Sequence, residues 1–385
     1  MTTELRKQLL REAETFVVKV GSRVLTKEKN RLDLDRLQQL GAQLSELADR
    51  GKKVVLVSSG AVAAGMGKLN LEKRPDDLAL LQAVASVGQA HLIQTYEGIL
   101  AKHDYHAAQV LLTAEDLDDR KRYLNLRNTI VALLGMKVIP IINENDAVSV
   151  DELLTTFGDN DRLAAMVAGL FKHPALIILS DVDGLFDTSM PTDESGAFPI
   201  VRSVERIDDR VFALAASESA LGSSGLGKGG MASKLRAAQF VTRSGAPAVV
   251  AGGKMQQVLI RLADGEELGT LFQPEARGLA PKKRWIGYTA QPSGRILCDQ
   301  GATEAIKQVG PSLLAIGIHS IDGSFDKGDI VAICDQQGIE FARGLTNYGS
   351  QELIKIRGLQ SDQIQAALGH CPYDEVIHRD NIAML

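Results

Sequence analysis

The chain has 385 residues, of which 45% are hydrophobic and 24% are charged, and its formal net charge is −5. This length favours two domains, and the acidic balance argues against a dedicated nucleic-acid binder, which would carry a clear basic excess. No apolar run approaches the roughly 20 residues needed to span a bilayer, and the N-terminus lacks a signal-peptide core. Three widely separated cysteines are expected to be reduced, structural thiols, which predicts a cytoplasmic protein.

The first buried strand is predicted from Thr15, in the segment TFVVKVGSRV, and a glycine turn follows it. Lys19 lies inside this strand, although burial of an ammonium group is costly unless the group is paired. Lys19 either faces an anion at the end of the strand or extends to the surface. We favour the anion, because Gly21 and Ser22 can offer backbone N–H groups to a phosphate.

A second strand, predicted over 53–58, continues into the small-residue segment SSGAVAAG. A strand that ends at Ser59 and Gly60 and becomes a helix of small residues brings backbone close to a ligand. Tight packing of the helix on the sheet would need the same glycines, and the sequence does not separate the two interpretations.

Helices and strands alternate along most of the chain. This alternation predicts a mainly parallel sheet between helices, which is a three-layer α/β/α sandwich. The remaining elements predicted for this region are helices over 33–50, 77–101, 120–135 and 206–221 and strands over 106–112, 175–180 and 246–251.

Residues 282–385 differ in character, with short strands separated by glycine turns. They contain 10 Lys and Arg against 12 Asp and Glu, so this part is mildly acidic. The pattern predicts a small β-rich domain. Its expected elements are strands at 285–288, 294–298, 329–334 and 340–346 and a helix at 301–308.

Two bursts of acidic and amide residues follow the apolar run that begins at Val138. The first is Asn143, Glu144, Asn145 and Asp146, and the second is Gly158, Asp159, Asn160 and Asp161. Ligands of α/β sheets bind where parallel strands end and helices begin. These side chains suit an ammonium group, lysines or a metal, while an Asx-rich turn with a helix cap is the alternative. Because Pro140 cannot donate to a ladder, the strand is expected to end early or bulge there.

A glycine-rich segment, GSSGLGKGGMASK, runs from Gly222 to Lys234 and leads into a helix. It begins like a Walker A loop, but Gly229 replaces the Ser or Thr that would bind magnesium, and no strand precedes it as in a dinucleotide fingerprint. Flexible glycines before a helix N-terminus, together with Lys228 and Lys234, favour a polyphosphate cradle. A purely structural glycine loop is the alternative.

Six motifs, taken in order, resemble the amino-acid kinase family and its glutamate 5-kinase branch. They are VVKVGSRVL, VSSGAVAAG, INENDAV, GDNDRLAA, LSDVDGLFD and GLGKGGMASK. The C-terminal part resembles a PUA domain in the segments SLLAIGI, FDKGDIV and ARGL. The resemblance implies a catalytic domain at 1–275, a PUA-like domain at 282–365 and a C-terminal extension at 366–385. It also implies ATP-dependent phosphorylation of the γ-carboxylate of L-glutamate, the first step of proline biosynthesis.

The resemblance assigns roles to individual residues. Lys19 and Lys234 would contact the transferring phosphoryl group, and Asp159 and Asp161 would organise the lysines and the substrate. Ser59 with Gly60 would hold glutamate or the γ-phosphate. The ammonium and carboxylate ends of glutamate would be bound by Asp146 and Asn160, supported by Asn143 and Asn145. The nucleotide would be bound by Lys19, Gly21, Ser180, Asp181, Lys228, Gly229, Gly230, Met231, Ala232, Ser233 and Lys234. A lysine at 228 departs from the small polar residue expected there.

The chemistry fits these residue types, because a carboxylate is already a nucleophile and needs no general base. Lysines, helix N-termini and magnesium would stabilise charge on the transferring phosphoryl group, with Mg²⁺ held mainly through phosphates and no dedicated protein metal site. The resemblance further implies a homo-oligomer and feedback inhibition by proline. Two rivals are another kinase of the same family, acting on aspartate, acetylglutamate or a nucleotide, and an RNA-binding regulatory protein. The acidic C-terminal part argues against the latter.

Overall fold

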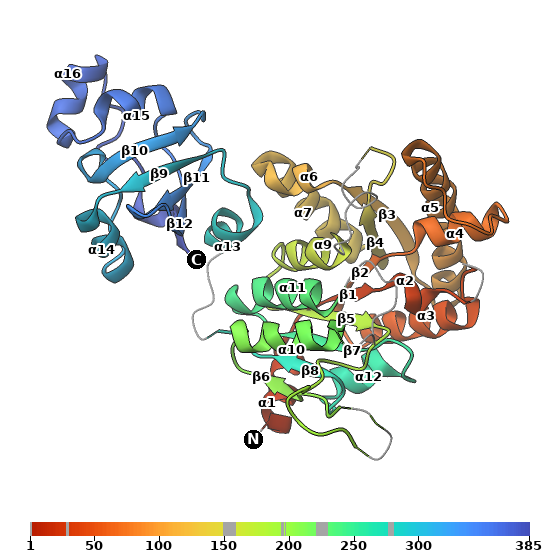
Figure 1. The fold of residues 1–385 in the computed structure, drawn as a ribbon. Helices are drawn as coiled ribbons and strands as arrows, with labels where there is room; N and C mark the ends of the chain where they lie inside the picture. The colour runs from red at the N-terminus through yellow and green to blue at the C-terminus, as the bar shows by residue number, and fades with distance from the viewer. Residues whose placement is uncertain are drawn as a thin grey trace. The chain divides into compact units, whose positions relative to one another are not determined.

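The computed structural model describes residues 2–27, 31–148, 159–193, 196, 198–220, 230–275 and 281–385. The chain divides into two compact units, Met1–Gly278 and Leu279–Leu385 (Figure 1). Each unit has a hydrophobic core of its own. Among the described residues, no helix combines the length and the apolar character that a membrane crossing requires.

The first unit is built on an eight-stranded sheet with the order β3-β4-β2-β1-β5-β7-β8-β6. Every neighbouring pair is parallel except β7 with β8. The central strands are buried along almost their whole length, which explains their near-continuous apolar sequences. The strands are β1 (Thr15–Val20), β2 (Lys53–Ser58), β3 (His106–Leu112), β4 (Val138–Glu144), β5 (Pro174–Ser180), β6 (Ser203–Val204), β7 (Ala248–Gly252) and β8 (Thr270–Phe272).

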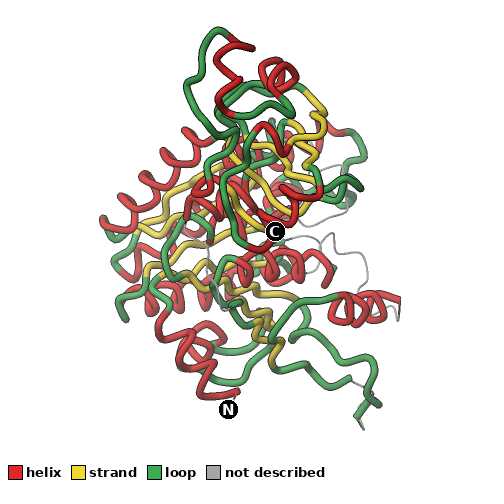
Figure 2. Tube along the Cα trace, turned by 90° about the vertical axis from the view of Figure 1, so that its left-hand side faces the viewer, coloured by secondary structure: helices red, strands yellow, loops and turns green. Residues whose placement is uncertain are grey.

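Helices cover both faces of this sheet, which confirms the predicted three-layer α/β/α architecture (Figures 1 and 2). One face carries α1 (Thr2–Glu12), α3 (Leu34–Asp49), α5 (Leu78–Leu100) and α12 (Val258–Ala263). The other face carries α7 (Arg120–Gly135), α9 (Asp159–Ala168), α10 (Asp209–Ala220) and α11 (Met231–Arg243). Three further helices in the described part of this unit are α2 (Ser22–Leu25), α4 (Ala61–Lys68) and α6 (Ala114–Asp118).

Helix α3 illustrates how local sequence sets these elements. The Asp33 carboxylate accepts a hydrogen bond from the Arg36 N–H and caps the helix, a contact worth about 1 kcal/mol. The leucines at 37, 40, 44 and 47 recur at helical spacing and are all buried. The helix therefore begins at its cap and packs one apolar face on the sheet.

Helices α4 and α5 approach each other closely because glycines lie at their contact. A Cβ atom added at Gly88 would lie 1.7 Å from the Ala61 carbonyl oxygen, and one added at Gly65 would lie 1.9 Å from the Val84 carbonyl oxygen. No side chain fits at either position. Gly65 is therefore required for close packing, but against helix α5 rather than against the sheet as predicted. Gly60 has a different reason to be glycine, because it caps α4 with a φ of 103°.

The structure corrects two expectations in the first unit. Strand β4 continues through Pro140 without ending or bulging, since its pairing with β3 is unbroken from Val138 to Glu144. Pairing of β4 with β2 is confined to Ile141 and Ile142. Pro140, which has no N–H to donate, therefore lies where β4 pairs with β3 alone. The second correction concerns the glycine-rich segment, whose end is helical from Met231 onward.

The second unit contains a five-stranded sheet with the order β10-β9-β11-β12-β13, and it confirms the predicted β-rich character. The expected strand at 285–288 is wrong, because Trp285–Thr289 forms a turn of π-helix whose first residues are buried. Burial of this short apolar run does not require extended backbone. The strands are β9 (Gly294–Cys298), β10 (Ile318–Gly323), β11 (Ile330–Cys334), β12 (Glu340–Leu345) and β13 (Ile382–Met384), and the helices are α13 (Pro281–Arg284), α14 (Gln300–Gln308), α15 (Ser350–Ile356) and α16 (Ile364–Leu368).

Candidate active site

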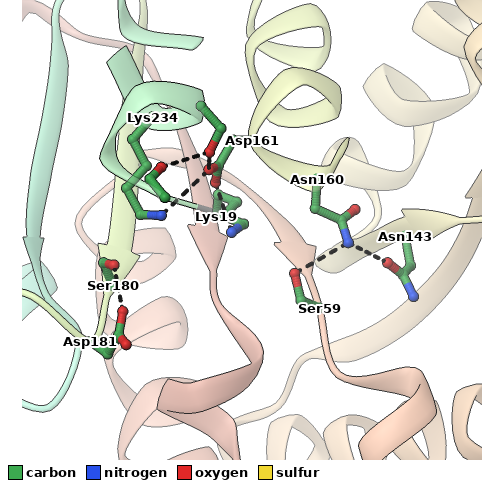
Figure 3. Close-up of polar contacts among 10 residues, drawn as sticks. Lys19, Ser59, Asn143, Asn160, Asp161, Ser180, Asp181 and Lys234 are labelled. Atoms are coloured by element: carbon green, nitrogen blue, oxygen red, sulfur yellow. Dashed lines mark hydrogen bonds and ion pairs between the residues drawn. The ribbon is translucent and has the colours of Figure 1, made fainter. Parts of the chain in front are cut away.

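The candidate active site lies where β1, β2, β4 and β5 end and where α9 and α11 begin (Figure 3). This edge gathers side chains from all six of these segments. Most of them form two clusters, which are joined by the neighbouring residues Asn160 and Asp161 in the first turn of α9. The parallel sheet explains the convergence, because parallel strands deliver their carboxyl ends to one edge.

The charged cluster consists of Lys19, Asp161, Ser233 and Lys234. The Lys19 Nζ lies 2.7 Å from Asp161 Oδ1, and the Lys234 Nζ lies 3.6 Å from Asp161 Oδ2. The Ser233 hydroxyl donates to Asp161 Oδ2 at 2.7 Å. Both lysine side chains are more than nine-tenths buried and the Asp161 side chain is fully buried. Two ammonium groups face one carboxylate, so the cluster carries a net charge of +1.

Charge and burial compete in this cluster. Burial by itself raises the pKa of Asp161, but the charges of Lys19 and Lys234 and the hydrogen bonds from Lys19 and Ser233 outweigh it and hold that pKa below its ordinary value. Burial lowers the pKa of Lys234, and repulsion from Lys19 adds to this effect despite the attraction of Asp161. The carboxylate therefore stays ionised, while Lys234 is a poorly solvated ammonium group.

The neutral cluster is a chain of hydrogen-bonded side chains, which we call the amide chain. The Asn160 Nδ2 donates to Ser59 Oγ at 3.2 Å and to Asn143 Oδ1 at 3.1 Å. The Asn143 Nδ2 in turn donates to Gln89 Oε1 at 2.9 Å. The amide chain thus links α9, the end of β2, the end of β4 and helix α5. Its three amide residues are buried, and Figure 3 shows Ser59, Asn143 and Asn160 facing one another.

A third polar group follows β5. The Ser180 hydroxyl donates to Asp181 Oδ1 at 3.1 Å, and Arg23 on α2 pairs with Asp181 Oδ2 at 2.8 Å. Burial raises the pKa of Asp181, but hydrogen bonds from Arg23, the Asp181 backbone and Ser180 lower it overall. The negative charge of Asp181 also acts on Lys234 and partly offsets its lowered pKa. Electrostatics therefore connects this group to the charged cluster.

The other predicted residues take several positions. Asp146 is buried and Asn145 half-buried at the turn that follows β4, where the Asn145 N–H donates to the Leu112 carbonyl. The Gly21 N–H donates to the Leu179 carbonyl, so it is not available to a phosphate. Gly230 caps α11, Met231 is buried and Ala232 half-buried in its first turn. Lys228, Gly229 and the side chain of Asp159 lie outside the described residues.

Comparison with known proteins identifies the family to which the chain belongs. Residues 14–252 match the amino acid kinase family, and residues 294–368 match the PUA domain. The chain belongs to the amino acid kinase family. It is 47% identical to a glutamate 5-kinase of Rhodopirellula baltica, over 99% of this chain and 96% of that one. It is 44% identical to a glutamate 5-kinase of Citrifermentans bemidjiense, over 99% and 100%. A solved UMP kinase from Bacillus anthracis has 16% identity and a TM-score of 0.45, over 69% of this chain and 98% of that one, too low a score to carry an argument.

Two residues of this amino acid kinase site were missed in the sequence. Arg23 lies in the motif VVKVGSRVL, but its partner Asp181 is 158 positions away in the sequence. Gln89 had a detectable signal, because it is a polar residue on the buried stripe of α5, which otherwise contains residues such as Val84, Ala85 and Leu92. A buried glutamine at such a position requires a hydrogen-bond partner.

Among the described residues, no three His, Cys, Asp or Glu side chains form a group that could hold a metal ion.

Proposed function

We propose that this chain transfers the γ-phosphoryl group of ATP to the γ-carboxylate of L-glutamate and forms L-glutamyl 5-phosphate, the first step of proline biosynthesis. The observation that carries the proposal is the placement of the net positive charged cluster directly beside the amide chain. The charged cluster suits a transferring phosphoryl group, and the amide chain suits a small polar acceptor. The near-full-length similarity to glutamate 5-kinases supports glutamate as that acceptor.

The reaction is a direct in-line transfer, in which a γ-carboxylate oxygen attacks the γ-phosphorus and the bond from that phosphorus to ADP breaks. The attacking carboxylate is ionised at neutral pH, so no side chain has to remove a proton. The obstacle is the meeting of two anions. Lys19 and Lys234 stabilise the charge on the transferring oxygens, and Asp161 holds both ammonium groups in place.

The remaining roles divide between acceptor and nucleotide. Ser59, Gly60, Asn143, Asn145, Asp146 and Asn160 bind glutamate, with Asp146 on its ammonium group. Ser180, Asp181 and residues 228–234 bind the nucleotide, and the N-terminus of α11 favours its phosphates. Gly21 would adjoin the nucleotide without donating its N–H, which is bonded to the Leu179 carbonyl. Asp159 helps Asp161 to organise the lysines.

Magnesium is the proposed metal cofactor. Bound to the phosphate oxygens of ATP, Mg²⁺ would neutralise part of their charge. We propose that Mg²⁺ arrives with the nucleotide and is held mainly through its phosphates.

The second unit is a PUA-like domain at 282–365 with an extension at 366–385, joined to a catalytic domain at 1–275. The extension contributes β13, which pairs with β12. We further propose a homo-oligomer that proline inhibits and that works in the cytoplasm, where ATP and glutamate are both available. The mildly acidic second unit favours no nucleic-acid partner.

The decisive test is a substrate screen with the purified chain, ATP and Mg²⁺. ADP release is measured with glutamate, aspartate, acetylglutamate and UMP. We expect turnover with glutamate and at least a hundredfold lower kcat/KM with the others. Faster turnover with another acceptor would replace the proposed substrate, and tight RNA binding at physiological salt without any turnover would favour a regulatory protein.

A further inference from the structure

We propose that Gln89 is a positioning residue for the acceptor amino acid, acting through Asn143 and Asn160. This inference rests on the proposed function and adds a residue from helix α5, which the sequence motifs do not include. Three observations carry it, namely the direction of the amide chain, the packing of α5 on α4 and the hydrogen bonding of Gln89 itself.

The hydrogen bonds of the amide chain determine which way each side-chain amide is turned. Both donors of the Asn160 amide are used, one on Ser59 and one on Asn143. Asn143 must therefore turn its carbonyl toward Asn160 and its NH₂ group away from it. The Gln89 carbonyl accepts from that NH₂ group and holds it in this orientation. Without an acceptor at position 89, the Asn143 side chain keeps only its contact with Asn160 and loses one of the two contacts that fix its orientation.

The packing of α5 on α4 fixes the position of this carbonyl. Gly88 precedes Gln89, and a Cβ atom there would meet the Ala61 carbonyl at 1.7 Å and the Gly65 nitrogen at 2.4 Å. Ala61 is the first residue of α4 and follows directly after Ser59 and Gly60. The same close contact therefore sets Gln89 and Ser59, the two ends of the amide chain, relative to each other.

The hydrogen bonding of Gln89 argues against a purely stabilising role. Gln89 is 6% exposed, and its Nε2 has no hydrogen-bond partner among the described residues. Burial of an unpartnered amide donor costs stability, and an apolar residue of similar size at position 89 would avoid that cost. The contact that accounts for a glutamine at this position is the one from its carbonyl to Asn143.

The test is the Gln89→Met variant of the full chain, with Gln94→Met as its control. Both glutamines lie on α5, but Gln94 is exposed. Methionine nearly conserves the volume and removes the acceptor. We expect KM for glutamate to rise about tenfold in Gln89→Met, while KM for ATP stays within twofold and the melting temperature within a few degrees. Gln94→Met should match the wild type in all three.

A second pair of variants tests the packing. Gly88→Ala forces α4 and α5 apart, and we expect the same selective rise in KM for glutamate together with a lower melting temperature. Gly98→Ala is its control on the same helix, because a Cβ atom there meets nothing within 4 Å. If Gly88→Ala does not fold, the Gln89→Met variant alone tests whether Gln89 positions the acceptor.

The outcomes separate the two proposals. Wild-type turnover with glutamate establishes the function independently of any variant. A Gln89→Met enzyme with unchanged KM for glutamate, or with equal rises in both KM values, overturns the positioning role and leaves the function intact. A lower melting temperature with unchanged KM values assigns Gln89 a structural role instead. Absence of ADP release from the wild type overturns both.

Discussion

The charged cluster and the amide chain adjoin in α9 but differ in how they bind. In the charged cluster, two buried lysines share one carboxylate, and their excess charge remains available to a substrate anion. In the amide chain, the described hydrogen bonds run between neutral groups. Such groups select a ligand by the directions of their hydrogen bonds rather than by charge. The difference matches the two problems of the reaction, because a phosphoryl group needs charge stabilisation whereas an amino-acid acceptor needs alignment. Damage to the two clusters should therefore have different kinetic signatures.

The largest expected effect is in the charged cluster. Lys234→Ala or Lys19→Ala should lower kcat by about 10²–10³, the typical loss when one charge-stabilising donor is removed. Steady-state ADP release measures it, and circular dichroism checks the fold. Lys172→Ala, at an exposed position, is the control. Near-wild-type turnover in both folded variants would remove these lysines from the mechanism.

The next effect contrasts two aspartates. Asp146→Asn removes the proposed partner of the substrate ammonium group, a loss of about 2–5 kcal/mol, so KM for glutamate should rise at least tenfold with KM for ATP nearly unchanged. Asp161→Asn should mainly lower kcat, because its carboxylate orients both lysines. Initial rates over both substrate concentrations separate the parameters. Matching defects in the two folded variants would contradict the division of roles.

A smaller effect is expected in the pH dependence of stability. Because the folded-state pKa of Asp161 lies below its ordinary value, its ionisation stabilises the folded chain above the unfolded-state pKa near 4. That contribution should be lost as pH falls through the folded-state pKa. The difference in melting temperature between wild type and Asp161→Asn should shrink from pH 6 to pH 3. Gln89→Met should keep the pH profile of the wild type, since an amide does not titrate.

The smallest effect is expected from removal of the second unit. All candidate residues of both clusters precede Gly278, and the two units have separate cores. A chain that ends at Gly278 should therefore keep kcat within about threefold, whatever happens to regulation or assembly. A folded 1–278 chain without activity at saturating substrates would show that the second unit completes the site.

The sequence was most informative where local signals agree. Strands 53–58 and 106–112 and helix 120–135 have the predicted bounds, because apolar periodicity and flanking turn residues mark the same positions. The ordered motifs also named Lys19, Asp161 and Lys234, which the fold brings into contact.

Tertiary contacts account for what the sequence did not reveal. The start of α11 was misplaced because its cap, Gly230, offers no side-chain signal. Gln89 was missed because its partner Asn143 is 54 positions away. The apolar run at Trp285 could be buried equally well as strand or helix, and packing decided between them.

The adjacency of Asn160 and Asp161 limits how this enzyme could evolve toward acceptors of other lengths. The two residues belong to different clusters, yet their Cα atoms are held about 3.8 Å apart by a single peptide unit. An insertion between them would rotate the rest of α9 by about 100° and carry one of the two clusters out of register. If the two clusters bind phosphoryl donor and acceptor as proposed, α9 keeps a fixed spacing between them, and room for a shorter or longer acceptor would have to come from the turn after β4, where Asn145 and Asp146 lie.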